Sequence, residues 1–334
     1  MPQTLKYGEN PHQSASIEFD EDTKDPLALG RFTAVNGVPL AEQVSKMGWN
    51  NVKDLSRGID TISRIAATCE KNLGAVPKIA VLIEHGNTAS AAIGDTDRVI
   101  YNAIHGYYRA SFGAFLITNI PMTEPVGFRV RQWMPAARPF SGIAAPVFDE
   151  QAARYFIRKS GLCHTMANPA LGEVGLVTTE RGEIQHTVRG GTVTQSPNVA
   201  VPTFPTDWDA GLRRDMSLAW GVCASSASNC ITIAKDGTVV ANAVGQPERA
   251  GACELAVILA KRANRAADIP GSAVASDSFF AFADGLDYLA RRKVKAVFAT
   301  SGSVNDEDVA EHMKQFDVIF HTVPDKDFRG FAGH

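Results

Sequence analysis

A glutamate and a histidine stand side by side directly after an apolar run, where catalytic residues are often found. The run at 79–83 reads IAVLI, and Glu84 and His85 follow it. Ligands bind beyond the carboxyl ends of strands in open α/β sheets. A histidine titrates near neutral pH, so it can accept a proton and return it. Taken alone, however, a single histidine at a strand end favours a structural role.

Other polar clusters also flank apolar runs, and each alone has a simple structural interpretation. Asn229 fits a turn before a strand, Asp277 and Asp284 fit helix caps, and the last residues fit a frayed tail. The clusters are LKYGENPHQ (5–13), EHGN (84–87), RASFGAF (109–115), SASNCITIAKDG (226–237), VGQPER (244–249), ASDSFFAFAD (275–284), TSGS (300–303) and DFRGFAGH (327–334).

Composition excludes several classes of protein. The 334 residues are 45% hydrophobic and 21% charged, which is ordinary for a globular protein of about two domains. A net charge of −3 provides no basic field for nucleic acid or an anionic membrane surface. No apolar run approaches the ~18 residues of a membrane span, and the first residues lack the apolar core of a signal peptide. We therefore expect a soluble, cytoplasmic protein with neither a nucleic-acid nor a membrane partner.

Common cofactor and metal motifs are missing from the sequence. Five cysteines without C-x-x-C spacing suggest neither a disulfide framework nor a zinc site. There is also no phosphate-binding P-loop, G-x-G-x-x-G, H-E-x-x-H or G-x-S-x-G. P-loop ATP hydrolysis, ordinary dinucleotide binding and zinc-protease chemistry are therefore not expected, and we predict no metal.

The apolar runs and the helical patterns between them predict a mixed α/β protein. Strands are expected at 79–83, 114–118, 175–179, 231–234, 239–243, 273–275, 294–300 and 318–320, and helices at 149–161, 252–268, 285–292 and 306–315. The alternation of strands and helices after residue 273 predicts parallel pairing. Lys235, Asp236 and Gly237 between two apolar runs predict an antiparallel hairpin. We place a domain boundary near residue 165.

Taken together, the polar clusters resemble the AICAR transformylase domain. This domain is the formyl-transferring half of a bifunctional purine-biosynthesis enzyme that also carries IMP cyclohydrolase. The resemblance covers essentially the whole chain. The family's motifs match KYGENPHQ (6–13), His85 after its strand, SFG (111–113), SN (228–229), the Gly-Gln-x-x-Arg pattern at 245–249, SDSFFAFAD (276–284) and RGFAGH (329–334). The cyclohydrolase segment that precedes the first motif has no counterpart here, so we expect the transformylase alone.

The resemblance implies a fold, an assembly and a reaction. The expected fold is two cytidine-deaminase-like, three-layer α/β/α subdomains with mixed sheets, at 1–165 and 166–334. Family members are homodimers with active sites at the subunit interface. They transfer a formyl group from 10-formyltetrahydrofolate to the 5-amino group of AICAR, an imidazole carboxamide ribonucleotide. The expected partners are therefore a nucleotide, a folate and a second copy of the chain.

The resemblance also assigns roles position by position. His85 is expected to be the proton shuttle, and Asn229 and Asp284 lie near the transferring group and the folate. A second set of residues is expected to bind the nucleotide or pack on the ligand: Lys6, Tyr7, Gly113, Arg249, Phe279, Arg329 and His334. The family ends in Arg-x-Phe-x-His, whereas RGFAGH has one extra residue before His334, so His334 matches the terminal histidine with a shift of one residue.

This sequence departs from the family at several charged positions. Glu84 stands where the family has a lysine beside the catalytic histidine, and Ala283 replaces an arginine. Ser141 and Ala224 replace an aspartate and a lysine in the same way. An ionised glutamate cannot donate a hydrogen bond and repels an oxyanion. Three interpretations stay open: an AICAR formyltransferase with a modified site, a folate-dependent formyltransferase for another amine, and a non-catalytic paralogue that binds a nucleotide or folate.

Overall fold

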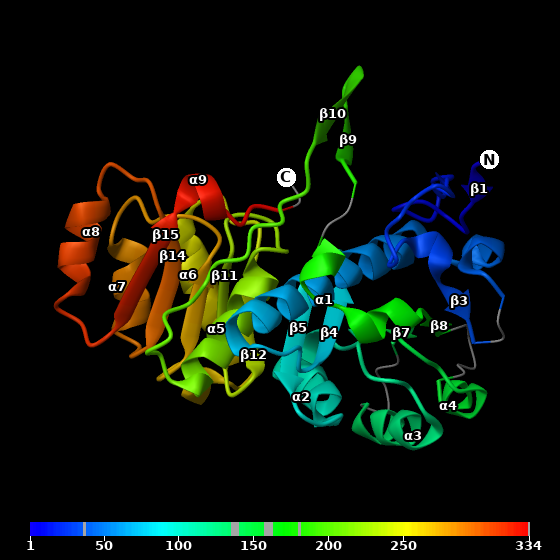
Figure 1. Ribbon diagram of the computed structural model, residues 1–334, viewed down its shortest axis with the longest axis horizontal. Helices are drawn as coiled ribbons and strands as arrows, with labels where there is room; N and C mark the ends of the chain where they lie inside the picture. Colours follow the sequence, from blue (N-terminus) through cyan, green and yellow to red (C-terminus); the bar gives the residue numbers. More distant parts are fainter. Residues whose placement is uncertain (36–37, 135–139, 157–162, 180–181, 333–334) are drawn as a thin grey trace.

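The fold is a three-layer α/β structure built on one mixed sheet, as the sequence predicted for the α/β class (Figure 1). The computed structural model describes residues 1–35, 38–134, 140–156, 163–179 and 182–332. In these ranges the large sheet has 11 strands. From one side to the other they are β15 (Ile319–Pro324), β14 (Ala296–Ser301), β13 (Ala273–Ser276), β11 (Ile231–Lys235), β12 (Thr238–Ala243), β5 (Asn87–Gly94), β4 (Lys78–Glu84), β6 (Phe115–Thr118), β7 (Gly142–Ala145), β8 (His164–Ala167) and β3 (Thr33–Ala34).

Helices cover both faces of this sheet because its central strands are apolar on both sides. In β4, Ile79, Val81 and Ile83 face one core, while Ala80 and Leu82 face another. The first core lies under α1 (Trp49–Leu73) and α5 (Ala210–Cys223) and spans both halves of the chain. The opposite face carries two cores, under α2 (Arg98–Gly106), α3 (Glu124–Trp133) and α4 (Glu150–Arg154), and under α6 (Arg249–Arg262), α7 (Asp284–Ala290) and α8 (Asp306–Met313). The short α9 (Asp325–Phe328) follows β15.

The pairing predicted for the second half is confirmed. β11 and β12 form an antiparallel hairpin whose turn holds Asp236 and Gly237 at positive φ, 51° and 69°. Two successive positive φ values define the turn that matches the twist of paired strands. β13, β14 and β15 pair in parallel, as the strand and helix alternation indicated.

Of two predictions for the middle of the chain, one is wrong and one is confirmed only in part. The strand expected at 175–179 is wrong, because Leu176–Thr179 is a 3-10 helix. The Gly175 N–H donates to Thr178 Oγ1, and the Leu176 N–H donates to the Glu70 carboxylate of α1 at 2.6 Å. These bonds take the donors that a strand ladder needs. The helix expected at 149–161 forms only over Glu150–Arg154, as α4, because Tyr155 and Phe156 form a turn; residues 157–162 lie outside the described ranges.

The two predicted subdomains share the single sheet. β8 crosses the expected boundary near residue 165 and pairs with β7 of the first half. Between the halves, β5 and β12 are joined at the registered pair Thr238 and Ala92. The division at residue 165 and the likeness to cytidine deaminase stay predictions.

Two small hairpins lie outside the main sheet. β1 (Gln3–Thr4) pairs with β2 (Ser16–Ile17) near the N-terminus. β9 (Ile184–Val188) pairs with β10 (Gly191–Gln195), and Figure 1 shows this ribbon extending from the body of the molecule. All of its strand residues except Ile184 are exposed. Within the described residues, every helix is too short or too polar to cross a membrane.

Helices α1 and α5 approach each other closely, and this approach generates a stability prediction. A Cβ added at Gly221 would lie 2.6 Å from the Ile65 Cα of α1. Because helix backbones cannot yield easily, Gly221→Ala should lower the free energy of unfolding by about 1–3 kcal/mol, measured by urea denaturation. Gly182→Ala is the control, since its new methyl group would meet no atom within 4 Å. Equal stability of the two variants would contradict this packing.

Candidate active site

The sequence-predicted clusters converge on one end of the large sheet. We call this end the site rim: β4, β12, β13, β14 and β15 end there, and β5, β6, β7 and β11 begin there. The register fixes the arrangement, because Glu84 pairs with Asn87, and Ile231 pairs with both Ala243 and Ser276. The segments that carry His85, Gly113, Asn229, Phe279 and Arg329 therefore all open onto the site rim.

His85 lies at the tip of a strained two-residue turn between β4 and β5. His85 and Gly86 both have positive φ, 53° and 73°. Such a conformation is uncommon for a residue with a side chain, and it is often found at functional sites. The Gly86 N–H donates to the Asp54 carboxylate of α1 at 2.6 Å, which holds the turn in place. The His85 side chain is 76% exposed, and its Nε2 lies 3.4 Å from Glu84 Oε1.

The Glu84 carboxyl is partly buried beneath this turn. It packs against the backbone of Gly113, where an added Cβ would lie 3.2 Å from Glu84 Oε1. Gly113 has a φ of 81° and precedes β6. Burial, followed by the nearby Asp54 carboxyl, raises the pKa of Glu84 to about 7. The structure thus brings together Glu84, His85 and Gly113, and it adds Asp54, which the sequence analysis missed.

A second cluster surrounds Arg249, the first residue of α6. Its guanidinium donates to Asn229 Oδ1 at 2.6 Å, to Ser276 Oγ at 2.8 Å and to the Asp277 carboxylate. The Asn229 amide also donates to the Gln246 carbonyl at 2.9 Å. Asn229 and Arg249, predicted separately from sequence, are therefore direct partners. Asp277 is completely buried and anchors the pair, whereas the sequence suggested only a helix cap.

A third cluster holds Arg329 near the C-terminal end of the described chain. Arg329 Nε donates to Asp325 at 2.7 Å, and the other oxygen of Asp325 accepts hydrogen bonds from Ser278 and Thr300. Burial pushes the pKa of Asp325 upward, but these hydrogen bonds outweigh burial and lower its pKa. Phe279 is half-buried beside this cluster. The predicted residues Phe279 and Arg329 thus lie on the same part of the site rim.

The remaining predicted site residues are Lys6, Tyr7, Asp284 and His334, and the first three form no described hydrogen bond with these three clusters. Tyr7 packs against the N-terminus of α1, where a Cβ at Gly48 would lie 2.3 Å from the tyrosine ring. Lys6 is exposed, and its backbone N–H donates to the Met47 carbonyl. Asp284 is exposed at the start of α7 and accepts from its neighbour's backbone. His334 lies outside the described residues.

A buried polar network links the His85 turn to the Arg249 cluster. The Asn242 amide of β12 donates to the Thr88 carbonyl of β5 at 3.0 Å and to Ser226 Oγ at 3.2 Å. Arg57 of α1 donates to the Ser225 carbonyl at 3.0 Å. Ser225 and Ser226 begin the loop that leads to Asn229. The two clusters are therefore held at fixed positions by hydrogen bonds between the halves.

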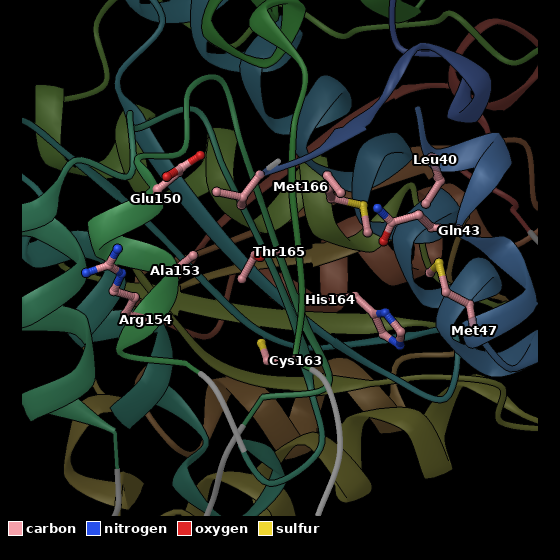
Figure 2. A pocket seen from close by; sticks show the side chains of 12 residues that line it. Leu40, Gln43, Met47, Glu150, Ala153, Arg154, Cys163, His164, Thr165 and Met166 are labelled. Carbon is pink, nitrogen blue, oxygen red and sulfur yellow. The ribbon is translucent and has the colours of Figure 1, made fainter. Parts of the chain in front are cut away.

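A cavity of about 330 Å³ lies apart from these clusters. Figure 2 shows that its walls come from β8, from α4 and from the segment before α1. Its lining residues are Ala34, Val35, Leu40, Gln43, Met47, Glu150, Ala153, Arg154, Cys163, His164, Thr165 and Met166. None of them is a sequence-predicted site residue. Within the described ranges, no group of three His, Cys, Asp or Glu side chains could hold a metal ion.

The Arg249 cluster generates a prediction about stability. The Arg249 side chain is 13% exposed and the Asp277 side chain 0%. Arg249→Met leaves a buried carboxylate unpaired, so it should lower the free energy of unfolding by about 3–5 kcal/mol. Adding Asp277→Asn should recover part of this loss in the same chemical denaturation experiment.

Arg291→Met is the matched control, because it breaks the exposed pair with Asp287. It should change the free energy of unfolding by at most about 1 kcal/mol. Similar losses for the two methionine variants would argue against a buried anchor at Asp277.

Comparison with known proteins identifies the family. The sequence model of the AICARFT/IMPCHase bienzyme family matches residues 1–259. The chain is 28% identical over 330 residues to the bifunctional purine biosynthesis protein PurH of Thermotoga maritima, covering 97% of this chain and 63% of that protein. It is 30% identical to the PurH proteins of Ruegeria sp. and Rhodospirillum rubrum, covering 92% of this chain and 56% of each of them. The chain thus spans about 56–63% of the length of these relatives. It belongs to the AICARFT/IMPCHase bienzyme family.

Proposed function

We propose that this chain transfers a formyl group from 10-formyltetrahydrofolate to the 5-amino group of AICAR. One observation carries the proposal: motif residues from widely separated parts of the sequence converge on the site rim. Glu84, His85 and Gly113 come from the first half of the chain, and Asn229 and Arg249 come from the second. The names of the relatives, which describe bifunctional purine biosynthesis proteins, support the same assignment.

The reaction requires a base, an oxyanion stabiliser and an acid. The amine of AICAR attacks the formyl carbon and must lose a proton, and the folate nitrogen must gain one as it leaves. His85 is exposed at a turn tip on the site rim, where it can accept the first proton and supply the second. The tetrahedral oxyanion needs hydrogen-bond donors. The amide of Asn229, oriented by Arg249, is our candidate donor.

Nucleotide binding is assigned to cations around the same rim. Guanidinium and ammonium groups suit a phosphate. Asp325 orients the Arg329 guanidinium, whose side chain is 48% exposed and so can also contact a ligand. Lys6 and Tyr7 precede α1, and Phe279 supplies an apolar surface for a ring. The roles of Asp284 and His334 near the folate belong to the same proposal.

A turnover assay tests the proposed function. The purified protein is mixed with AICAR and 10-formyltetrahydrofolate, and tetrahydrofolate release is followed together with a thermal-shift scan of each ligand. Release that depends on AICAR supports the proposal. Binding of the folate without turnover would favour a formyltransferase that acts on another amine. The carboxyl of Glu84 would suit an acceptor that is cationic or rich in hydrogen-bond donors. Neither binding nor turnover would overturn the functional assignment.

The proton shuttle is tested separately by substitution. His85→Ala should reduce kcat by about 100-fold or more, because general acid–base catalysis contributes at least that factor. His312→Ala, on the last turn of α8 and away from the site rim, is the matched control and should keep the parent rate. Unchanged turnover in His85→Ala, with its melting temperature preserved, would end the assignment of His85.

We also infer that the protein is a homodimer. The β9–β10 ribbon supports this inference, because an isolated two-stranded hairpin is marginally stable in water and gains from packing on another surface. Val188 and Val193 on it are 46% and 52% exposed. Light scattering at micromolar concentration should give twice the mass of 35.8 kDa. A monomer that turns over AICAR at full rate would contradict the dimer.

A further inference from the structure

Two carboxyl groups, those of Asp54 and Glu84, contact the His85 turn, and they differ in their partners. Asp54 is 5% exposed, and its Oδ1 accepts the Gly86 N–H at 2.6 Å. Glu84 Oε2 is also buried but has no hydrogen-bond partner among the described residues. Its other oxygen, Oε1, lies 3.4 Å from His85 Nε2. One carboxyl therefore has a buried donor and the other does not.

The charges around the pair come from every neighbouring element. α1 contributes Asp54, and the turn contributes His85, whose carbonyl accepts from the Asn87 amide of β5. The loop before β6 places the Gly113 backbone against the Glu84 carboxyl. Arg57 of α1 donates to the Ser225 carbonyl. Among the described contacts, Glu84 pairs with the ring of His85, and Asp54 accepts the Gly86 N–H.

Burial of two adjacent negative charges is unfavourable, and protonation of one of them relieves it. A backbone N–H stabilises the charged form of its acceptor, which favours ionised Asp54. Glu84 Oε2 lacks such a donor, which favours the protonated form of Glu84. We propose that Asp54 and Glu84 share one proton, that Asp54 keeps the charge, and that Glu84 acts as a neutral carboxylic acid beside His85.

The titration behaviour agrees with this geometry. Burial, and then the Asp54 charge, raises the pKa of Glu84 from 4.5 to about 7. Burial also raises the pKa of Asp54, and the hydrogen bond from Gly86 opposes that increase. Between about pH 5 and about pH 7 the pair therefore retains a proton that two exposed carboxyls would have lost.

The neutral form explains how a glutamate can stand beside the reacting groups. This part of the inference rests on the proposed formyl transfer. An ionised Glu84 would repel the oxyanion of the tetrahedral intermediate, whereas a neutral acid does not. Asp54 acts through other groups and is a positioning residue. It accepts the Gly86 N–H, which holds the turn that presents His85, and its charge keeps the proton on Glu84.

Because Glu84 loses this proton as the pH rises through about 7, formyl transfer should become slower over the same pH range.

Two substitutions separate these effects. Glu84→Gln mimics the neutral acid in size and charge. Asp54→Asn removes the charge and leaves an oxygen that can accept the Gly86 N–H. Glu84→Ala, which removes the whole carboxyl, is the reference for complete loss of the side chain.

The first readout is stability against pH and does not depend on activity. Because the pKa of Glu84 is higher in the folded protein than its ordinary value of 4.5, the folded state loses stability as the pH rises from about 4.5 through about 7. Glu84→Gln avoids this loss. The difference in melting temperature, Glu84→Gln minus parent, should therefore become more positive as the pH rises from about 5 to about 8. The increase should be smaller when both proteins also carry Asp54→Asn. A constant difference across this range would overturn the shared proton.

The second readout is kcat/KM for formyl transfer against pH. Above about pH 7, kcat/KM of the parent should fall by up to about 10-fold per pH unit, as expected for loss of one required proton. The kcat/KM of Glu84→Gln should fall less steeply. If Glu84→Gln is as slow as Glu84→Ala at every pH, the ionised carboxylate is required and the proposal is wrong. If no variant transfers formyl but the stability result holds, the proposed function fails and the shared proton stands.

Discussion

The close packing of α1 on α5 determines how the two halves of this protein are arranged. At the junction of β5 and β12 the large sheet has one registered pair, between Thr238 and Ala92. The helices above that junction add a continuous apolar core, and Gly221 gives the space for their contact. α1 also carries Asp54, and Arg57 bonds the loop that leads to Asn229. One helix therefore positions groups on both parts of the site rim.

The electrostatics of the rim show one clear exception to local charge compensation. Asp277 is paired with Arg249, and Asp325 is paired with Arg329 and two hydroxyl groups. Asp54 accepts a backbone N–H. Glu84 and Asp277 each have a buried oxygen with no donor among the described residues, but Asp277 is paired with Arg249, whereas the ion-pair partner of Glu84 is the ring of His85. Perturbed titration without local compensation is typical of functional sites, and this exception lies beside His85, the proposed proton shuttle.

Much of the fold could be predicted because its signals are local. The apolar run at 79–83, the turn at Asp236 and Gly237, and the alternation of strands and helices after residue 273 each depend on neighbouring residues. The error at 175–179 has a long-range cause, since Glu70 takes the Leu176 N–H. No local pattern could reveal that bond.

The candidate site was predicted less completely than the fold. The resemblance identified Asn229 and Arg249, and the structure shows that they are bonded. Asp54 was missed because it lies 30 positions before Glu84 and meets the turn only through the packing of α1. The burial of Asp277 likewise depends on tertiary packing. The roles of Lys6 and the other ligand contacts stay predictions because they concern substrates.

A crystal structure with AICAR bound would test the central claim most directly, which is that the site rim is where the reaction takes place. The account predicts that the 5-amino group lies within hydrogen-bond reach of His85, with the nucleotide extending along the rim toward Arg249 and Arg329. Density for AICAR in the 330 Å³ cavity beside β8, with the rim unoccupied, would contradict the account.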